Sequence, residues 1–314
     1  MTERTLILSD LHLGRPDGVR RAVELELLLE PGSTVILNGD TAELHHPAYQ
    51  TIAEDELGAL QAIAATRGVH LKLLSGNHDP LLSGQRMLTL AQGQILVTHG
   101  DAFHPAVAPW SVSAPAMRRA WEETMRSTPA ALRDSSDTVF NAARDAAIAE
   151  WLDNGHGATQ STLGRIAVRP WSAVMIAWYW MRYPRLACRF AAKYAPQARI
   201  LVVGHSHRAG RWRVGCRTVL NTGSFSFPGR PCAAILQGDT VSLWPVGRAA
   251  QTHLPRYSLA ARPVASGTLP RGTATPAAIS RDESGRPNAA SMTRPALSTA
   301  ARPTPIASSD PSNA

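Results

Sequence analysis

Five short apolar runs in this chain each stop directly before residues that bind metals or move protons. An apolar run that ends at a tight loop is typical of a buried strand. The runs, with the residues that follow them, are Thr5–Leu8 before Asp10 and His12, Val35–Leu37 before Gly39-Asp40, Val69–Leu74 before Gly76-Asn77-His78-Asp79, Ile95–Val97 before His99, and Ile200–Val203 before Gly204-His205-Ser206-His207. Since α/β proteins build sites at the carboxyl ends of strands, these five loops are expected to meet.

The order of apolar patterns indicates an α/β fold interrupted by a helical insertion. Residues 4–105 alternate strands with helices, which are expected around Arg20–Leu29 and Ile52–Thr66. Strand-like runs are absent from 106–196 and return after Arg199 as short antiparallel strands joined by tight turns. We therefore expect a core made of residues 1–105 and 197–256, with residues 106–196 as a helical lid insertion.

Three helical segments are expected within the insertion. One begins after Ser113, with Pro115 in its first turn, and another follows Ser135-Ser136-Asp137. The third segment, Trp171–Met181, is apolar on almost every side and must be covered by protein or by something lipid-like.

The C-terminal residues have a different composition. Beyond Arg256 the sequence consists mainly of Ala, Pro, Ser, Thr, Gly and Arg, with few large apolar residues. Such a segment cannot offset its ordering entropy by burial, so residues 257–314 are expected to be a disordered tail.

Charge is distributed unevenly along the chain, whose formal net charge is +8. No acidic residue lies between Asp153 and Asp239, an interval that is rich in arginine. A field of one sign favours an anionic partner, which leaves open a phosphorylated substrate, an anionic membrane or a nucleic acid. An alternative is that a GC-rich genome simply favours arginine codons.

The chain is expected to be cytoplasmic, with peripheral contact at the inner face of the membrane left open. It has no basic and apolar leader, and no apolar run has the length of a spanning helix. Its cysteines, Cys188, Cys216 and Cys232, are odd in number and scattered, so they support neither a disulfide framework nor a zinc-thiolate site.

The side chains after the five runs are suited to divalent metals. They provide carboxylates, one amide and several imidazoles, and this set suits Mn²⁺, Fe²⁺ or Zn²⁺. Each short motif is weak alone, but five in order, each behind a strand, indicate a metal site.

In this order the motifs resemble those of the calcineurin-like metallophosphoesterase superfamily: D-x-H, G-D, G-N-H-D, H and G-H-x-H. The resemblance covers residues 5 to about 244 apart from the insertion. It implies a four-layer sandwich of two mixed β-sheets flanked by helices. It also implies two divalent metal ions, with Mn²⁺ as the expected species, Fe²⁺ or Zn²⁺ as the alternatives, and Asp40 as the bridge. The implied ligands are Asp10, His12, Asp40 and His207 for one ion, and Asp40, Asn77, His99 and His205 for the other.

The resemblance further implies a reaction, in which a metal-bridging hydroxide cleaves a phosphodiester or pyrophosphate bond. Two divalent ions and two carboxylates leave a net positive charge, which suits an anionic phosphate ester. His78 is expected to stabilise the transition state or protonate the leaving group, oriented by Asp79. The alternative for Asp79 is a cap that holds its own loop.

Within the superfamily, the chain is most similar to the branch of UDP-2,3-diacylglucosamine pyrophosphatase. The shared features are Ser9–Gly14, His99-Gly100-Asp101 and the helical insertion, whereas His78 replaces the arginine of that branch. A lipid-linked nucleotide is thus the expected substrate. The alternatives are a nuclease or nucleotide phosphodiesterase on the same metal centre, and a catalytically silent scaffold.

Four further residues near these motifs have expected roles. Glu43 is expected to support a ligand, and His104 to mark the hinge into the insertion. His45 and His46 are expected to lie in a solvated loop, with the edge of the cleft as the alternative.

Overall fold

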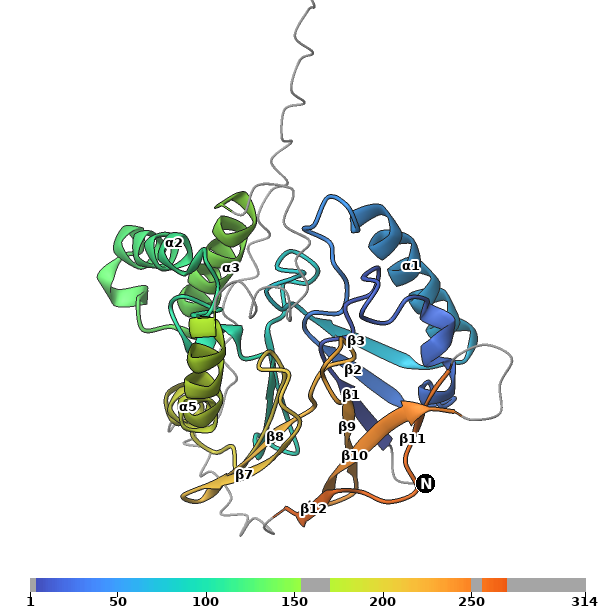
Figure 1. Cartoon of the computed structure of the whole chain (residues 1–314). Coiled ribbons are helices and arrows are strands. Elements are labelled where there is room, and N and C mark those ends of the chain that lie inside the picture. The colour runs from blue at the N-terminus through green and yellow to red at the C-terminus, as the bar shows by residue number, and fades with distance from the viewer. Residues whose placement is uncertain (1–3, 154–169, 250–255, 270–314) are drawn as a thin grey trace, which may run out of the picture. The chain divides into compact units, whose positions relative to one another are not determined.

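Two mixed β-sheets form the centre of the computed structural model, which describes residues 4–153, 170–249 and 256–269 (Figure 1). In the described residues the first sheet has seven strands, in the order β11-β10-β9-β1-β2-β3 with β12 also paired to β10. Its strands are β1 (Arg4–Leu8), β2 (Thr34–Asn38), β3 (His70–Leu74), β9 (Cys232–Gln237), β10 (Thr240–Arg248), β11 (Tyr257–Leu259) and β12 (Ala265–Thr268). Strands β1, β2 and β3 are parallel, and the other pairings are antiparallel.

The second sheet has the order β4-β5-β6-β8-β7. Its strands are β4 (Met87–Leu90), β5 (Ile95–Thr98), β6 (Ile200–Val203), β7 (Gly210–Val214) and β8 (Arg217–Asn221). The central strands β5, β6 and β8 are parallel, whereas β4 and β7 pair antiparallel at the two edges. Strand β4 is not predicted by the sequence pattern, because this four-residue edge strand is only partly buried.

Alternate residues of the strands point to different layers, as the pleat of a strand requires. Ile7 and Ile36 pack between the two sheets, together with Ile95 and Val202 of the second sheet. Their neighbours in sequence, such as Leu6 and Val35 in the first sheet, face the helices instead. The result is three apolar cores between four layers, and the fold class expected from the sequence is confirmed.

Helices cover the outer face of each sheet (Figure 1). On the first sheet lie α1 (Gln50–Thr66) and the 3-10 helix η1 (Ala22–Leu28), so the helix expected at Arg20–Leu29 is shorter and tighter than predicted. On the second sheet lie α2 (Ala114–Ser127), α3 (Ser136–Asp153) and α5 (Pro170–Tyr194). Two short 3-10 helices, η2 (Asp101–Phe103) and η3 (Ala130–Leu132), lie in the connections.

The segment expected to be a lid is the outer helical layer of the second sheet. Helices α2, α3 and α5 share one apolar core with residues of β5, β6 and β8. Because this core is continuous with the sheet, the described part of the insertion packs as a layer of the fold. The boundary at residues 106–196 remains a prediction, and residues 154–169 lie outside the described part.

Burial of the apolar segment Trp171–Met181 is one-sided, so the described protein covers only part of it. Tyr179 is fully buried, whereas Trp171, Val174 and Met181 are 71%, 51% and 65% exposed. None of the described helices has the length and apolar character needed to cross a membrane.

The expected disordered tail from residue 257 is corrected for its first part. Strands β11 and β12 both pair with β10, and Tyr257 packs against Phe225 with ring centroids 4.9 Å apart. Leu269 is also buried. The physical reason is that the nine-residue strand β10 has backbone groups available for additional pairing. Residues 270–314 lie outside the described part.

Candidate metal centre

Loops at the carboxyl ends of β1, β2, β3, β5 and β6 bring the predicted ligands together. Six of these side chains are buried, and only His207 is partly exposed. The predicted ligands form two groups whose nitrogen or oxygen atoms lie within 4.8 Å of one another: Asp10, His12, Asp40 and His207, and Asp40, His99 and His205. Asp40 belongs to both groups, as a bridging carboxylate would. Their roles as ligands remain predictions.

The backbone of these loops is held in an unusual conformation. Five of the predicted ligands have left-handed φ angles, between 50° and 62°: Asp10, His12, Asp40, His205 and His207. Left-handed conformations of residues other than glycine cost on the order of 1–3 kcal/mol each and gather at functional sites. This strain is therefore independent structural support for a functional site at the strand ends.

Glycines in two of the loops allow the close approach of the acidic side chains. A Cβ atom added to Gly76 would collide with the Asp40 side chain, and one added to Gly204 would collide with Asp10 and Ser9. The glycines of the Gly-Asn-His-Asp and Gly-His-x-His motifs are thus explained by packing against the candidate metal site.

The Nε2 atoms of His12 and His207 lie close together. The Nδ1 atom of His12 lies 2.7 Å from Oε1 of Glu43, so its proton is donated to that carboxylate. The Nε2 atom then faces Nε2 of His207 at 3.4 Å, and the latter atom is 3.1 Å from Oδ1 of Asp10. Burial lowers the pKa of His12 although Glu43 opposes it. Electron-rich atoms that converge in this way favour a cation between them.

His99 has a buried nitrogen without a hydrogen-bond partner. Its Nδ1 atom lies 2.9 Å from the Asn38 carbonyl oxygen, and its Nε2 atom, 3.2 Å from Oδ2 of Asp40, makes no hydrogen bond. Burial lowers the pKa of His99, but the carboxylates of Asp40 and Asp10 outweigh burial and raise it to about 10. In the metal-free protein a proton balances these carboxylates, and a divalent cation would displace that proton.

His205 is oriented by the insertion. Its Nε2 atom lies 3.1 Å from the Val107 carbonyl oxygen, and its Nδ1 atom lies 2.9 Å from Oδ1 of Asn77. Burial and the charge of His99 lower the pKa of His205 to about 4, so its ring is neutral. With its Nε2 proton donated to Val107, Nδ1 keeps its lone pair toward the Asn77 amide oxygen, an arrangement that fits a second cation.

Asp79 does not orient His78, which corrects the sequence-based expectation. Its carboxylate accepts backbone hydrogen bonds from Gly76 at 2.7 Å, Asp40 at 3.1 Å and Thr41 at 2.6 Å. Burial and the charge of Asp40 raise the pKa of Asp79 to about 6. Asp79 is therefore the cap that holds two metal-site loops together.

Glu43 contacts both a predicted ligand and the predicted catalytic histidine. One carboxylate oxygen contacts His12, and the other lies 3.0 Å from Nδ1 of His78. Burial raises the pKa of Glu43, but His78 and His12 outweigh burial and hold it well below its usual range. Burial lowers the pKa of His78, but Glu43 and Asp40 raise it to about 9. The pairing with His78 was not predicted, although the family resemblance suggested a supporting role for Glu43.

The remaining histidines take different positions. His45 contacts the His78 carbonyl through Nδ1 and lies 6.5 Å from the Trp151 ring, so it borders the site and is not a solvated residue. His46 stacks on Tyr49 in the loop before α1. His104 lies after η2, with its ring 6.2 Å from that of Tyr179, where the chain enters the helical layer.

Two aromatic residues of α5 bind the site loops directly, and sequence reasoning missed both. The buried Tyr183 hydroxyl donates to the carbonyl oxygen of Gly204 at 2.8 Å and lies 3.2 Å from that of His99. The Trp180 indole donates to the Ser206 carbonyl at 2.8 Å. No local signal distinguishes them, because Trp180 lies in the apolar segment and Tyr183 lies just beyond it, between Arg182 and Arg185.

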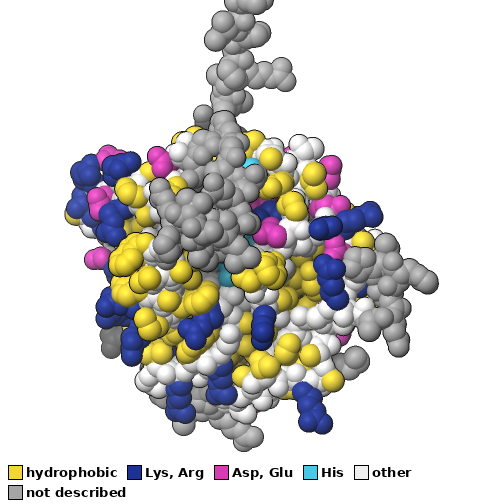
Figure 2. Space-filling view, viewed as in Figure 1, with side chains coloured by type: hydrophobic (Ala, Val, Ile, Leu, Met, Phe, Trp, Pro, Cys, Tyr) yellow, Lys and Arg dark blue, Asp and Glu magenta, His cyan; other side chains and the backbone are white. Residues whose placement is uncertain are grey.

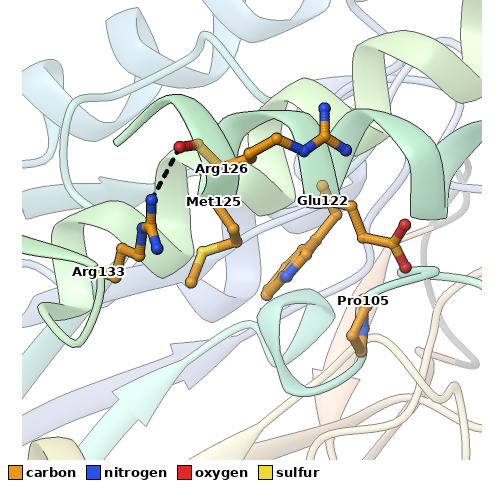
Figure 3. A pocket seen from close by; sticks show the side chains of 6 residues that line it. Pro105, Glu122, Met125, Arg126 and Arg133 are labelled. Carbon is orange, nitrogen blue, oxygen red and sulfur yellow. Dashed lines mark hydrogen bonds between the residues drawn. The ribbon is translucent and has the colours of Figure 1, made fainter. Parts of the chain in front are cut away.

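A hollow of about 450 Å³ lies beside α2, apart from the predicted ligands (Figure 3). Its lining includes Trp121, Met125 and Pro105, with Arg133 donating to the Arg126 carbonyl at its rim. None of the predicted metal ligands lines it. The candidate metal centre therefore rests on the buried side-chain clusters rather than on this hollow.

Comparison with known proteins gives only distant likenesses. No family model matches the chain, and no curated protein matches it. A conserved uncharacterized protein from Streptococcus pneumoniae, described as a predicted phosphoesterase, is 14% identical over 83% of this chain and 99% of its own, with a TM-score of 0.37. Vps29 from Chaetomium thermophilum is 14% identical over 86% of this chain and 99% of its own, with a TM-score of 0.39.

A third similar structure is a cold-active protein-tyrosine phosphatase from a Shewanella species. It is 13% identical over 77% of this chain and 78% of its own, with a TM-score of 0.37. At such low identities and TM-scores, these likenesses carry no conclusion about activity, ligands or partners.

Proposed function

We propose that this chain is a dimetal phosphohydrolase that cleaves a phosphodiester or pyrophosphate bond. The carrying observation is the convergence of carboxylate and imidazole atoms within 4.8 Å of one another, in two groups that share Asp40. Buried polar groups without partners are costly, and divalent cations would remove that cost. The first ion would be held by Asp10, His12, Asp40 and His207, and the second by Asp40, Asn77, His99 and His205.

Bound divalent ions would polarise the phosphoryl oxygens and lower the pKa of the attacking water. The chain itself contributes two ligand carboxylates, those of Asp10 and Asp40, against four positive charges from two ions. The site then keeps a positive charge that attracts a phosphate ester. Tyr183 holds the loop that begins at Gly204, and the Val107 carbonyl holds the ring of His205. Both contacts would keep the ligands in place.

His78 is the group assigned to proton transfer. Glu43 holds its Nδ1 atom and stabilises the imidazolium, so the opposite nitrogen is free to donate a proton to the leaving oxygen. The side chain is 27% exposed, unlike the six buried ligands, and it is therefore accessible to a substrate at the edge of the site.

A lipid-linked nucleotide such as UDP-2,3-diacylglucosamine is the proposed substrate. The support is the motif resemblance together with the basic interval between Asp153 and Asp239. The same basic interval favours a second candidate, a nuclease or nucleotide phosphodiesterase. Peripheral contact with an anionic membrane is part of the first proposal, because a lipid-linked substrate lies in a membrane.

Metal reconstitution tests the proposed activity. The chain is stripped with a chelator, reloaded with Mn²⁺, Fe²⁺ or Zn²⁺, and assayed on UDP-2,3-diacylglucosamine, a bis-aryl phosphate diester and single-stranded DNA. We expect no turnover without metal, recovery with Mn²⁺, and unchanged behaviour in the control variant His46→Ala. Two metals bound without turnover of any substrate would favour a silent scaffold, and full turnover without metal would exclude the proposed centre.

A further inference from the structure

Helix α5 has an apolar stripe that the described fold leaves in water. Trp171, Val174, Trp178 and Met181 follow the spacing i, i+3, i+7 and i+10, which places them on one side of the helix, with Trp178 partly buried against the core. Trp171, Val174 and Met181 are 71%, 51% and 65% exposed. The opposite side carries the buried Tyr179 and Tyr183, so α5 is already anchored and its exposed stripe is not needed for that packing.

The same side of α5 becomes basic toward its C-terminal end. Arg182, Arg185 and Arg189 are exposed and continue the stripe at helical spacing. Arg208, which is also exposed, lies just before β7, a strand that contacts α5. We call the apolar stripe and these arginines the α5 face. Figure 2 shows hydrophobic side chains gathered over α5 with basic side chains around them.

Charge complementarity indicates an anionic partner for the α5 face. The whole interval between Asp153 and Asp239, which contains α5 and β7, has no acidic residue. A patch that combines exposed apolar side chains with a basic border is characteristic of segments that lie at a membrane surface.

Stacking of arginines on the tryptophans distinguishes a membrane from a nucleic acid. The Arg182 guanidinium lies 4.6 Å from the centroid of the Trp178 ring, and that of Arg208 lies 5.8 Å from Trp180. An arginine covers one face of each of these rings, which leaves less aromatic surface for a stacked base. Val174 and Met181 offer no base contact either, whereas both suit the acyl boundary of a bilayer.

We propose that the α5 face docks on the surface of an anionic lipid bilayer. The apolar stripe enters the headgroup boundary and the arginines contact lipid phosphates. Trp180 and Tyr183 connect this helix to the loops of His205, His207 and His99, so docking holds the candidate metal centre beside the bilayer. The link to a lipid substrate rests on the proposed function, whereas docking itself does not.

Co-sedimentation of the full chain with vesicles tests docking. One vesicle contains only phosphatidylcholine, and the other also contains about one third phosphatidylglycerol. We expect binding to the anionic vesicle alone. At about fivefold per arginine, Arg185→Gln/Arg189→Gln should weaken binding on the order of 30-fold. The control Arg118→Gln/Arg119→Gln removes the same charge from exposed positions of α2 and should change binding little.

The apolar stripe is tested separately with Trp171→Ser/Met181→Ser, which should also lose vesicle binding. The control Ile52→Ser, at a 52% exposed position of α1, should not. Melting temperatures and aryl diester hydrolysis are measured for every variant, so a failure of docking is distinguished from a failure of the proposed function. Equal binding by wild type and α5 variants would overturn the proposal. Binding of single-stranded DNA, and not of vesicles, through the arginines would also overturn it.

Discussion

Oε2 of Glu43 lies 3.0 Å from Nδ1 of His78, while the other oxygen of the same carboxylate contacts His12. One buried carboxylate thus positions the proposed proton donor and a proposed ligand at the same time. Such outer partners of metal ligands typically contribute about 10–100-fold to metal affinity or activity.

Replacing Glu43 with Gln should therefore lower kcat about 10–100-fold, with weaker affinity for one metal ion. The amide keeps the shape of the side chain but removes the charge that stabilises the His78 imidazolium. Steady-state kinetics and metal titration are the measurements. Glu54→Gln is the matched control, because the exposed Glu54 of α1 contacts Gln50 and neither histidine in the described structure. Unchanged kinetics in Glu43→Gln would contradict the assigned role.

His78→Ala should lower kcat while two metals remain bound, because His78 is assigned to proton transfer. General acid and base groups typically contribute about 10²–10⁴-fold. The measurements are kcat at saturating substrate and elemental analysis of the purified variant. Loss of metal would instead make His78 a ligand or a structural residue.

Asp79→Asn should lower thermal stability, unlike His78→Ala. The Asp79 carboxylate accepts backbone hydrogen bonds from Gly76, Asp40 and Thr41, and an amide group would turn a donor toward these donors. Hydrogen bonds to a charged group are worth about 1.5–3 kcal/mol, so we expect a loss of at least about 2 kcal/mol in the free energy of unfolding. Denaturant unfolding of the metal-free protein measures this loss. A stable variant with reduced kcat would restore Asp79 as a partner of His78.

The sequence predicted the parts of this site that depend on local pattern. Short apolar runs set the strands, and because parallel strands end at one edge, the residues after them had to meet. The pairing of Asp79 with backbone amides, and of Glu43 with His78, depends on loop geometry that the spacing of residues does not define. Tyr183 and Trp180 act through contacts more than twenty residues away in sequence, between elements whose packing only the fold determines.

Strands β11 and β12 likewise could not be predicted from local sequence pattern. The segments Tyr257–Leu259 and Ala265–Thr268 carry little apolar pattern of their own. They form strands because β10 offers backbone partners, and this pairing is not visible in a local window.

Asp40→Ala should remove both metals, because Asp40 belongs to both ligand groups. Replacing a residue that would hold one ion alone, as in His207→Ala, should remove one metal. Elemental analysis of the two purified variants therefore separates the bridging from the single role. If Asp40→Ala retains two metals per chain, Asp40 is not the bridge.

The C-terminal strands allow a sharp truncation experiment. A chain that ends at residue 269 keeps β11, β12 and the buried Leu269, so its melting temperature should match that of the full chain. A chain that ends at residue 255 also loses Tyr257, which packs on Phe225, and the contact of Arg256 with Glu26 at 3.0 Å. The two large buried side chains that the shorter chain lacks are Tyr257 and Leu269. Their burial is worth about 3–6 kcal/mol, so the free energy of unfolding should fall by that order.

Calorimetry of both truncated chains, each stripped of metal, measures the difference without interference from ligand binding. The comparison isolates residues 256–269, because both chains lack everything that follows. If the two chains melt at the same temperature as the full protein, β11 and β12 contribute nothing to the sheet. If the chain ending at 269 also melts early, the residues beyond 269 stabilise the fold, against the expectation from their composition.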